Sequence, residues 1–167
     1  MTVQQYLAYF DEMMTPTEPL FRMFREDQLG WKPTEKSFSA AQLMTHIAAS
    51  FLVYGHGIAS GNWGFASMRE LFVANRRTAS STIDESVAAL HANYREFRNL
   101  IGGLSESEFN EGEIDSPQLG RVPRWRAAML AMEHHASHKA ELFMYLKMIG
   151  EPVHTGHLYS DRRNPQA

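Results

Sequence analysis

Three histidines are crowded into one stretch of this sequence, at His134, His135 and His138. Positions four apart share a face of an α-helix, so His134 and His138 would present two imidazoles one turn apart. Because the backbone sets their separation, such a pair can bind one divalent metal with little reorganisation. The pair alone is a weak signal, since HxxxH also arises by chance and buried histidines are often hydrogen-bonded residues of a core.

His46 is the best candidate for a third ligand. It lies between Leu43 and Ile47 in a segment with helical spacing, near the core edge of the helix expected there. In the functional interpretation, His46, His134 and His138 are three neutral imidazoles that face one metal and leave its remaining positions open to water or substrate. In the alternative, His46 is a hydrogen-bonded histidine between helices, and spacing alone slightly favours this second interpretation.

Two neighbours of the pair receive a plainer interpretation. His135 shares its stripe with Lys139, so we expect it at the boundary between core and solvent. Glu141 follows His138 by almost one turn and could support the site, but exposed carboxylates are the rule, and we expect it to face solvent.

The elements that must position these residues are helical, because helical spacing dominates the chain and strict two-residue alternation is rare. Ser39 and Gln42 form a capping box that begins a long helix, with Ser37 as a second candidate for the cap. Residues 65–76 are expected to form a short helix or an ordered crossover, and residues 104–121 a loop. The other expected helices cover residues 3–14, residues 83–101 and residues 123–149. A capping box at residues 15–18 is expected to restart the first helix, which then continues to about residue 28.

These elements predict an all-α fold: a four-helix bundle with one longer crossover and a short extra helix. The chain has 167 residues, about the length of one domain. We therefore expect the bundle over residues 1–153 and a polar, extended tail over residues 154–167.

Composition excludes several classes of function. Lys and Arg number 16 against 19 Asp and Glu, a net charge of -3, so we expect no nucleic-acid partner. Apolar stretches end well short of the ~20 residues that span a bilayer, and the N-terminus lacks the basic region of a signal peptide. We expect a cytoplasmic protein without a membrane partner. The chain has no cysteine, so its metal ligands are nitrogen and oxygen, and any reactive sulfur must arrive with a cosubstrate.

The order of residues around the histidines resembles the DinB family of DinB/YfiT-like metalloenzymes. The resemblance rests on two stretches, LGWKPTEKSFSAAQLMTHIAAS and EHHASHKAELFMYLKMIGEPV. It covers nearly the whole chain and implies a four-helix bundle that binds a divalent metal through His46, His134 and His138. In many relatives Arg-Gly-Gln follows the second histidine of the pair, whereas Lys-Ala-Glu follows it here.

The resemblance also implies a function. It suggests a metal-dependent enzyme acting on a small molecule, either an S-transferase that uses a low-molecular-weight thiol or a hydrolase, and a homodimer. The alternative is a non-catalytic, stress-linked helical module whose metal is structural or absent. Nitrogen ligands suit zinc or nickel, which we expect first, and also iron or copper. The sequence assigns no catalytic side chain and no organic cofactor.

Overall fold

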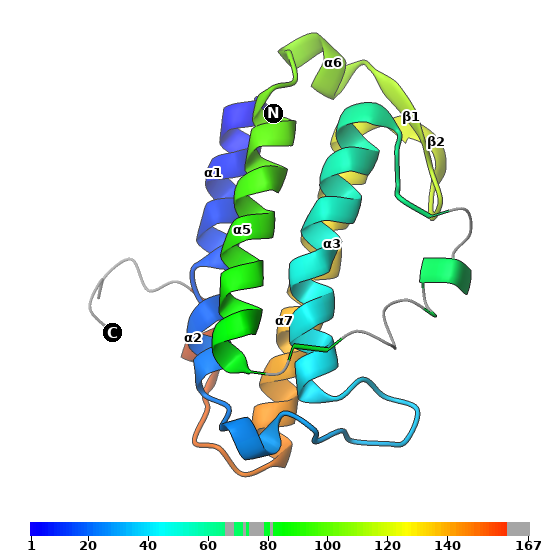
Figure 1. Ribbon diagram of the computed structural model, residues 1–167. Helices are drawn as coiled ribbons and strands as arrows, with labels where there is room; N and C mark the ends of the chain where they lie inside the picture. The colour runs from blue at the N-terminus through cyan, green and yellow to red at the C-terminus, as the bar shows by residue number, and fades with distance from the viewer. Residues whose placement is uncertain (66–68, 72, 74–78, 81, 160–167) are drawn as a thin grey trace.

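The computed structural model describes residues 1–65, 69–71, 73, 79–80 and 82–159. Within these residues four helical elements run lengthwise along one core (Figure 1): α1 (Val3–Met14) continued by α2 (Thr17–Arg22), α3 (Ala40–Ser60), α5 (Ile83–Gly102) and α7 (Arg124–Met148). Helix α3 packs against both α5 and α7, while α1 and α2 pack against α5. The expected all-α four-helix bundle is confirmed.

Aromatic side chains from three helices form the centre of the core. The rings of Phe10 on α1, Phe51 on α3 and Phe97 on α5 lie 5.3–5.7 Å apart between centroids, and each side chain is buried. Aromatic contacts of this kind add to the stabilisation that burial of the rings provides. This cluster holds α3 in place between its neighbours.

The beginning of α3 follows its local sequence. The Ser39 hydroxyl accepts a hydrogen bond from the backbone N–H of Gln42, and the Gln42 side chain accepts one from the backbone N–H of Ser39. This reciprocal arrangement satisfies two otherwise unpaired donors at the helix end and confirms Ser39 as the cap. At the other end Gly61 takes a left-handed conformation with φ of 77°, which glycine adopts without steric cost.

The prediction that a helix restarts after α1 and continues to about residue 28 is only partly correct. The Thr15 hydroxyl donates back to the Asp11 carbonyl, and the Thr17 hydroxyl is buried and hydrogen-bonded to Nε2 of His135. Because these side chains have other partners, the capping box expected at residues 15–18 does not form. Helix α2 also ends at Arg22, well before residue 28, and the short 3₁₀ helix η1 (Glu26–Gln28) follows it.

The loop expected over residues 104–121 contains regular structure instead. Helix α6 (Glu106–Asn110) is followed by an antiparallel hairpin of β1 (Glu113–Ser116) and β2 (Gly120–Pro123). A capping box of Ser105 and Glu108 begins α6, and this Ser-x-x-Glu pattern was the signal in the sequence that could have revealed it.

Two other expectations concern segments that the structure describes in part. Most of the helix or crossover expected over residues 65–76 falls on residues outside the described ranges, although residues 69–71 are helical. The tail expected to be extended contains the 3₁₀ helix η2 (Thr155–Leu158), and residues 160–167 lie outside the description. The domain boundary after residue 153 stays a prediction. Among the described residues, no helix has the length and hydropathy needed to cross a membrane.

Candidate metal centre

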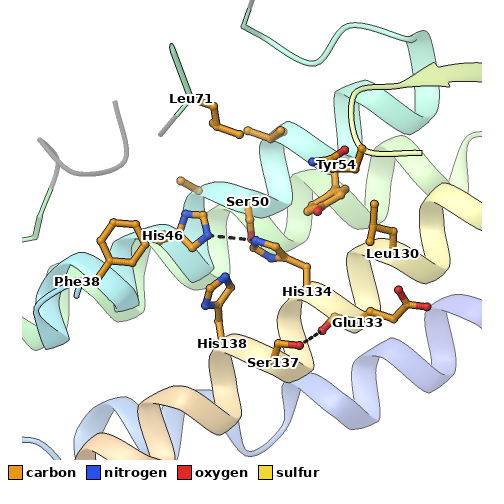
Figure 2. Close-up of a pocket in the computed structure, with 13 residues that line it drawn as sticks. Phe38, His46, Ser50, Tyr54, Leu71, Leu130, Glu133, His134, Ser137 and His138 are labelled. Carbon is orange, nitrogen blue, oxygen red and sulfur yellow. Dashed lines mark hydrogen bonds between the residues drawn. The ribbon is translucent and has the colours of Figure 1, made fainter. Parts of the chain in front are cut away.

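Helices α3 and α7 bring the three predicted histidines together. His46 projects from α3, and His134 and His138 project from successive turns of α7 (Figure 2). Nε2 of His46 lies 3.1 Å from Nε2 of His134, and its ring centroid lies 4.7 Å from that of His138. Each residue offers one ligand atom, and these atoms all lie within 4.8 Å of one another.

The donor set fits a divalent metal. Around a tetrahedral zinc ion with Zn–N bonds of 2.0–2.1 Å, neighbouring nitrogens are separated by about 3.3–3.4 Å, close to the 3.1 Å observed between His46 and His134. Burial, followed by the neighbouring His138 and His46, lowers the pKa of His134 to about 2. His134 is therefore a neutral imidazole, the form that binds metals. The three-histidine group can hold a metal ion.

A cavity of about 480 Å³ borders this group. Apart from the histidines, most of its wall is apolar or aromatic: Phe38, Ala49, Val53, Tyr54, Leu71 and Leu130 (Figure 2). The volume is within the range of small-molecule sites. The serine hydroxyls in the wall are already used, because Ser50 donates to the Ile47 carbonyl and Ser137 to the Glu133 carbonyl. The cavity therefore suits a small molecule with a mainly apolar body.

From the sequence, Tyr54 could face the metal cavity but a core role was favoured, and Ser50 was not identified, although both carry a signal in α3. Ser50 and Tyr54 follow His46 at intervals of four, so all three share one helix face. The Tyr54 ring contacts His134 at 5.2 Å between centroids, and burial together with the charge of Glu133 raises the Tyr54 pKa to about 12. Tyr54 is thus a neutral phenol beside the histidines.

The expected position of His135 is wrong. We predicted a boundary residue, but the His135 side chain is only 1% exposed and packs against Phe10 and Phe51 in the core. Lys139 is buried as well, and its ammonium donates to the Met13 carbonyl at the end of α1. The lysine suggested solvent, yet its long apolar stem can lie in a core when the ammonium finds a carbonyl acceptor.

This packing places His135 and His134 on different sides of α7. His135 and Lys139 belong to its core face, whereas His134 and His138 are half-buried at the cavity. Burial, followed by the charge of Lys139, lowers the pKa of His135 to about 3, and burial lowers that of Lys139 to about 8.

The expectation that Glu141 faces solvent is only partly correct, because its side chain is 39% exposed but its carboxylate also contacts the site. Its Oε2 accepts a hydrogen bond from Nδ1 of His138 at 2.9 Å. This hydrogen bond is the first cause that holds the pKa of Glu141 below its usual value. The hydroxyl of Tyr145 lies 3.1 Å from both the second carboxylate oxygen, Oε1, and the Phe38 carbonyl. Glu141 therefore connects one of the clustered histidines to the loop that precedes α3.

Fold and site together define a class of protein: a helical bundle whose facing helices carry a three-histidine group able to hold a metal. The chain belongs to the DinB superfamily, whose family model matches residues 9–142.

Individual relatives agree with this membership. The chain is 30% identical over 149 residues to the uncharacterized protein YjoA of Bacillus subtilis (strain 168), covering 87% of this chain and 90% of YjoA. A crystal structure of YjoA, described as a DinB-like protein, superposes with a TM-score of 0.68 at 26% identity, covering 89% of this chain and 94% of that one. A DinB family member from Shewanella denitrificans shares the fold, with a TM-score of 0.62 at 14% identity over 96% of this chain and 90% of the other.

Proposed function

We propose that the protein binds one divalent metal through His46, His134 and His138 and uses it in a reaction on a small molecule. The observation that carries this proposal is the convergence of three imidazoles from α3 and α7 beside a cavity of about 480 Å³. Three neutral nitrogen ligands leave coordination positions open, which is the arrangement of catalytic rather than structural metal sites.

The side chains around the metal site have distinct roles in this proposal. A divalent metal bound there would supply Lewis-acid chemistry, lowering the pKa of a water or thiol that it binds. The apolar wall, with Phe38, Val53 and Leu130, would hold the body of the substrate and exclude water. Glu133 is the one carboxylate among the described residues that line the cavity, and it can accept the proton that a water or thiol releases.

We propose two reaction types for this site, S-transfer that uses a low-molecular-weight thiol and hydrolysis. The chain has no cysteine, so a thiol nucleophile must come from a cosubstrate. Zinc or nickel is the proposed metal, with iron or copper as alternatives; imidazole nitrogens suit all four.

We propose further that the protein is a cytoplasmic homodimer that binds no nucleic acid. The net charge of -3 supports the last point. Exposed apolar side chains on α7, Trp125, Met144 and Met148, support self-association. Light scattering of the purified protein would measure its mass in solution, and a monomer at every concentration would contradict the dimer.

Elemental analysis of protein purified without a histidine tag tests the metal site. We expect about one divalent ion per chain in the wild type, and none in the double variant His46→Ala/His138→Ala. Stoichiometric metal in the double variant would overturn the ligand assignment.

A screen of the metal-loaded protein tests the reaction, using electrophiles with and without added thiols, and simple esters and amides. Turnover that requires a thiol would establish transfer, and turnover in water alone would establish hydrolysis. Turnover that survives complete metal removal would overturn the proposed chemistry, whereas bound metal without any turnover would favour a structural metal.

A further inference from the structure

We infer that Glu141 is a positioning residue for His138: its carboxylate holds the imidazole in the Nδ1–H tautomer, so that Nε2 is the nitrogen presented to the metal. The inference rests on the proposed three-histidine metal site and deepens it. It concerns a position where this chain carries a carboxylate three residues after the last histidine of the HxxxH pair.

The geometry around His138 determines which of its ring nitrogens carries the proton and which one can bind the metal. Nδ1 of His138 lies 2.9 Å from Oε2 of Glu141. An ionised carboxylate has lone pairs and no proton, so the imidazole must be the donor in this contact. A neutral imidazole carries only one N–H, and with that proton on Nδ1 the lone pair is on Nε2. The contact therefore selects both the tautomer and the ligand atom.

His134 provides a contrast within the same cluster. Its Nε2 faces His46, whereas its Nδ1 is buried without a hydrogen-bond partner among the described residues. No such acceptor holds the ring of His134, which is oriented by packing against Tyr54. Of the two histidines contributed by α7, His138 is the one whose tautomer a carboxylate controls.

Glu141 is itself held in position. The Tyr145 hydroxyl lies 3.1 Å from Oε1, the carboxylate oxygen that His138 does not use. Tyr145 is buried, and its ring contacts Trp31 edge to face at 5.2 Å between centroids. With one oxygen facing a buried tyrosine and the other accepting from the histidine, the carboxylate has little freedom to rotate away.

A carboxylate in this position changes the metal site in two ways. It orients the ring before the metal arrives, and its negative charge makes Nε2 a better electron donor. Loss of such a partner typically weakens metal binding by about 10- to 100-fold. Glutamine at the same position could still accept from Nδ1–H through its amide oxygen but carries no charge, so it should retain the orientation and lose part of the affinity.

Two measurements on Glu141→Ala and Glu141→Gln test the inference. The first uses the metal-free protein, whose ring nitrogens are labelled with ¹⁵N, and reads the tautomer of His138 by NMR at a pH where the ring is neutral. We expect the Nδ1–H form in the wild type and in Glu141→Gln, and appearance of the Nε2–H form in Glu141→Ala.

The second measurement is zinc affinity by competition with a chromophoric chelator. We expect a loss of about 10- to 100-fold for Glu141→Ala, and a smaller loss for Glu141→Gln. Glu96→Gln, an exposed glutamate on α5, is the matched control and should bind zinc like the wild type.

Each outcome decides between the inference and the proposed function. If Glu141→Ala retains both the wild-type tautomer and the wild-type zinc affinity, the inference is overturned while the metal site stands. If the wild type binds no divalent metal, both are overturned. Should Glu141→Ala not fold, Glu141→Gln still decides, because equal affinity in that variant and the wild type would contradict a role for the negative charge.

Discussion

Nε2 of His46 lies 3.1 Å from Nε2 of His134, although 88 positions separate the two residues in the sequence. Two ring nitrogens this close share either a proton or a metal ion, since two lone pairs facing each other repel. Without a metal, one neutral imidazole donates its Nε2–H to the other ring, and burial, which lowers the pKa of His134 to about 2, keeps that ring uncharged. With a metal, both Nε2 lone pairs can bind the same ion, and a ligand that binds only the folded arrangement stabilises the folded state.

Metal addition should raise the melting temperature. A ligand at 100 times its dissociation constant stabilises the fold by about 2.7 kcal/mol, which for a chain of this size corresponds to about 5–10 °C. Calorimetry of chelator-treated protein, with and without added zinc, measures the shift. The double variant His46→Ala/His138→Ala is the control, and an equal shift in that variant would mean that zinc stabilises the protein at another place.

The metal-free protein should lose stability in mild acid. His135 has a pKa lowered to about 3 in the folded state by burial, against about 6.5 when unfolded. Between these values the unfolded chain binds more protons, so its population grows as the pH falls. At pH 5 the effect of this one group is at most about 2 kcal/mol.

Urea unfolding of metal-free protein at pH 7.5 and pH 5 measures this loss. His135→Gln, which can still hydrogen-bond to Thr17, should lose less free energy of unfolding than the wild type over the same interval. His56→Gln, at an exposed position of α3, serves as the control. Equal pH dependence in the wild type and His135→Gln would show that other groups control acid stability.

Replacing Lys139 should weaken the junction between α7 and α1. Its ammonium donates to the Met13 carbonyl at 2.8 Å, and the side chain is buried. Lys139→Met retains the apolar stem but leaves that carbonyl without its donor, at a cost of about 1–3 kcal/mol. Chemical denaturation measures the change. Lys147→Met removes an exposed lysine from the same helix and should cost much less; equal costs would contradict the role assigned to the buried ammonium.

Gly57→Ala should displace Trp63. A Cβ atom at residue 57 would lie 2.2 Å from the indole ring, and something must shift to accommodate it. Overpacking of this kind costs about 1–3 kcal/mol, more than the ~1 kcal/mol that alanine gains over glycine inside a helix. The tryptophan emission should shift as the indole leaves its buried position. In Gly30→Ala, where the added Cβ meets no atom within 4 Å, both stability and emission should remain close to the wild type.

Local patterns in the sequence were enough to predict the long helices and the His134/His138 pair. The Ser39–Gln42 capping box marks the beginning of α3, and the four-residue interval places His134 and His138 on one face wherever α7 lies. Such features depend on neighbours within one turn, so they can be recognised without the rest of the fold. His46 was named as the best third candidate from its position between Leu43 and Ile47, but spacing alone slightly favoured the other interpretation, because spacing within a chain cannot show which helices face each other; the family resemblance then implied it as a ligand.

Tertiary packing alone decided which face of α7 is buried. Residue types suggested that Lys139 and its stripe lie near solvent. The Met13 carbonyl at the end of α1, however, accepts a hydrogen bond from the Lys139 ammonium, and His135, on the same stripe, is buried as well. The partners of Glu141 lie within one turn on α7 itself, His138 before it and Tyr145 after it, so their spacing was present in the sequence; packing decided that Tyr145 is buried and lies beside the Phe38 carbonyl. Whether a charged side chain such as Lys139 is buried depends on partners from elsewhere in the fold, and a sequence pattern does not contain them.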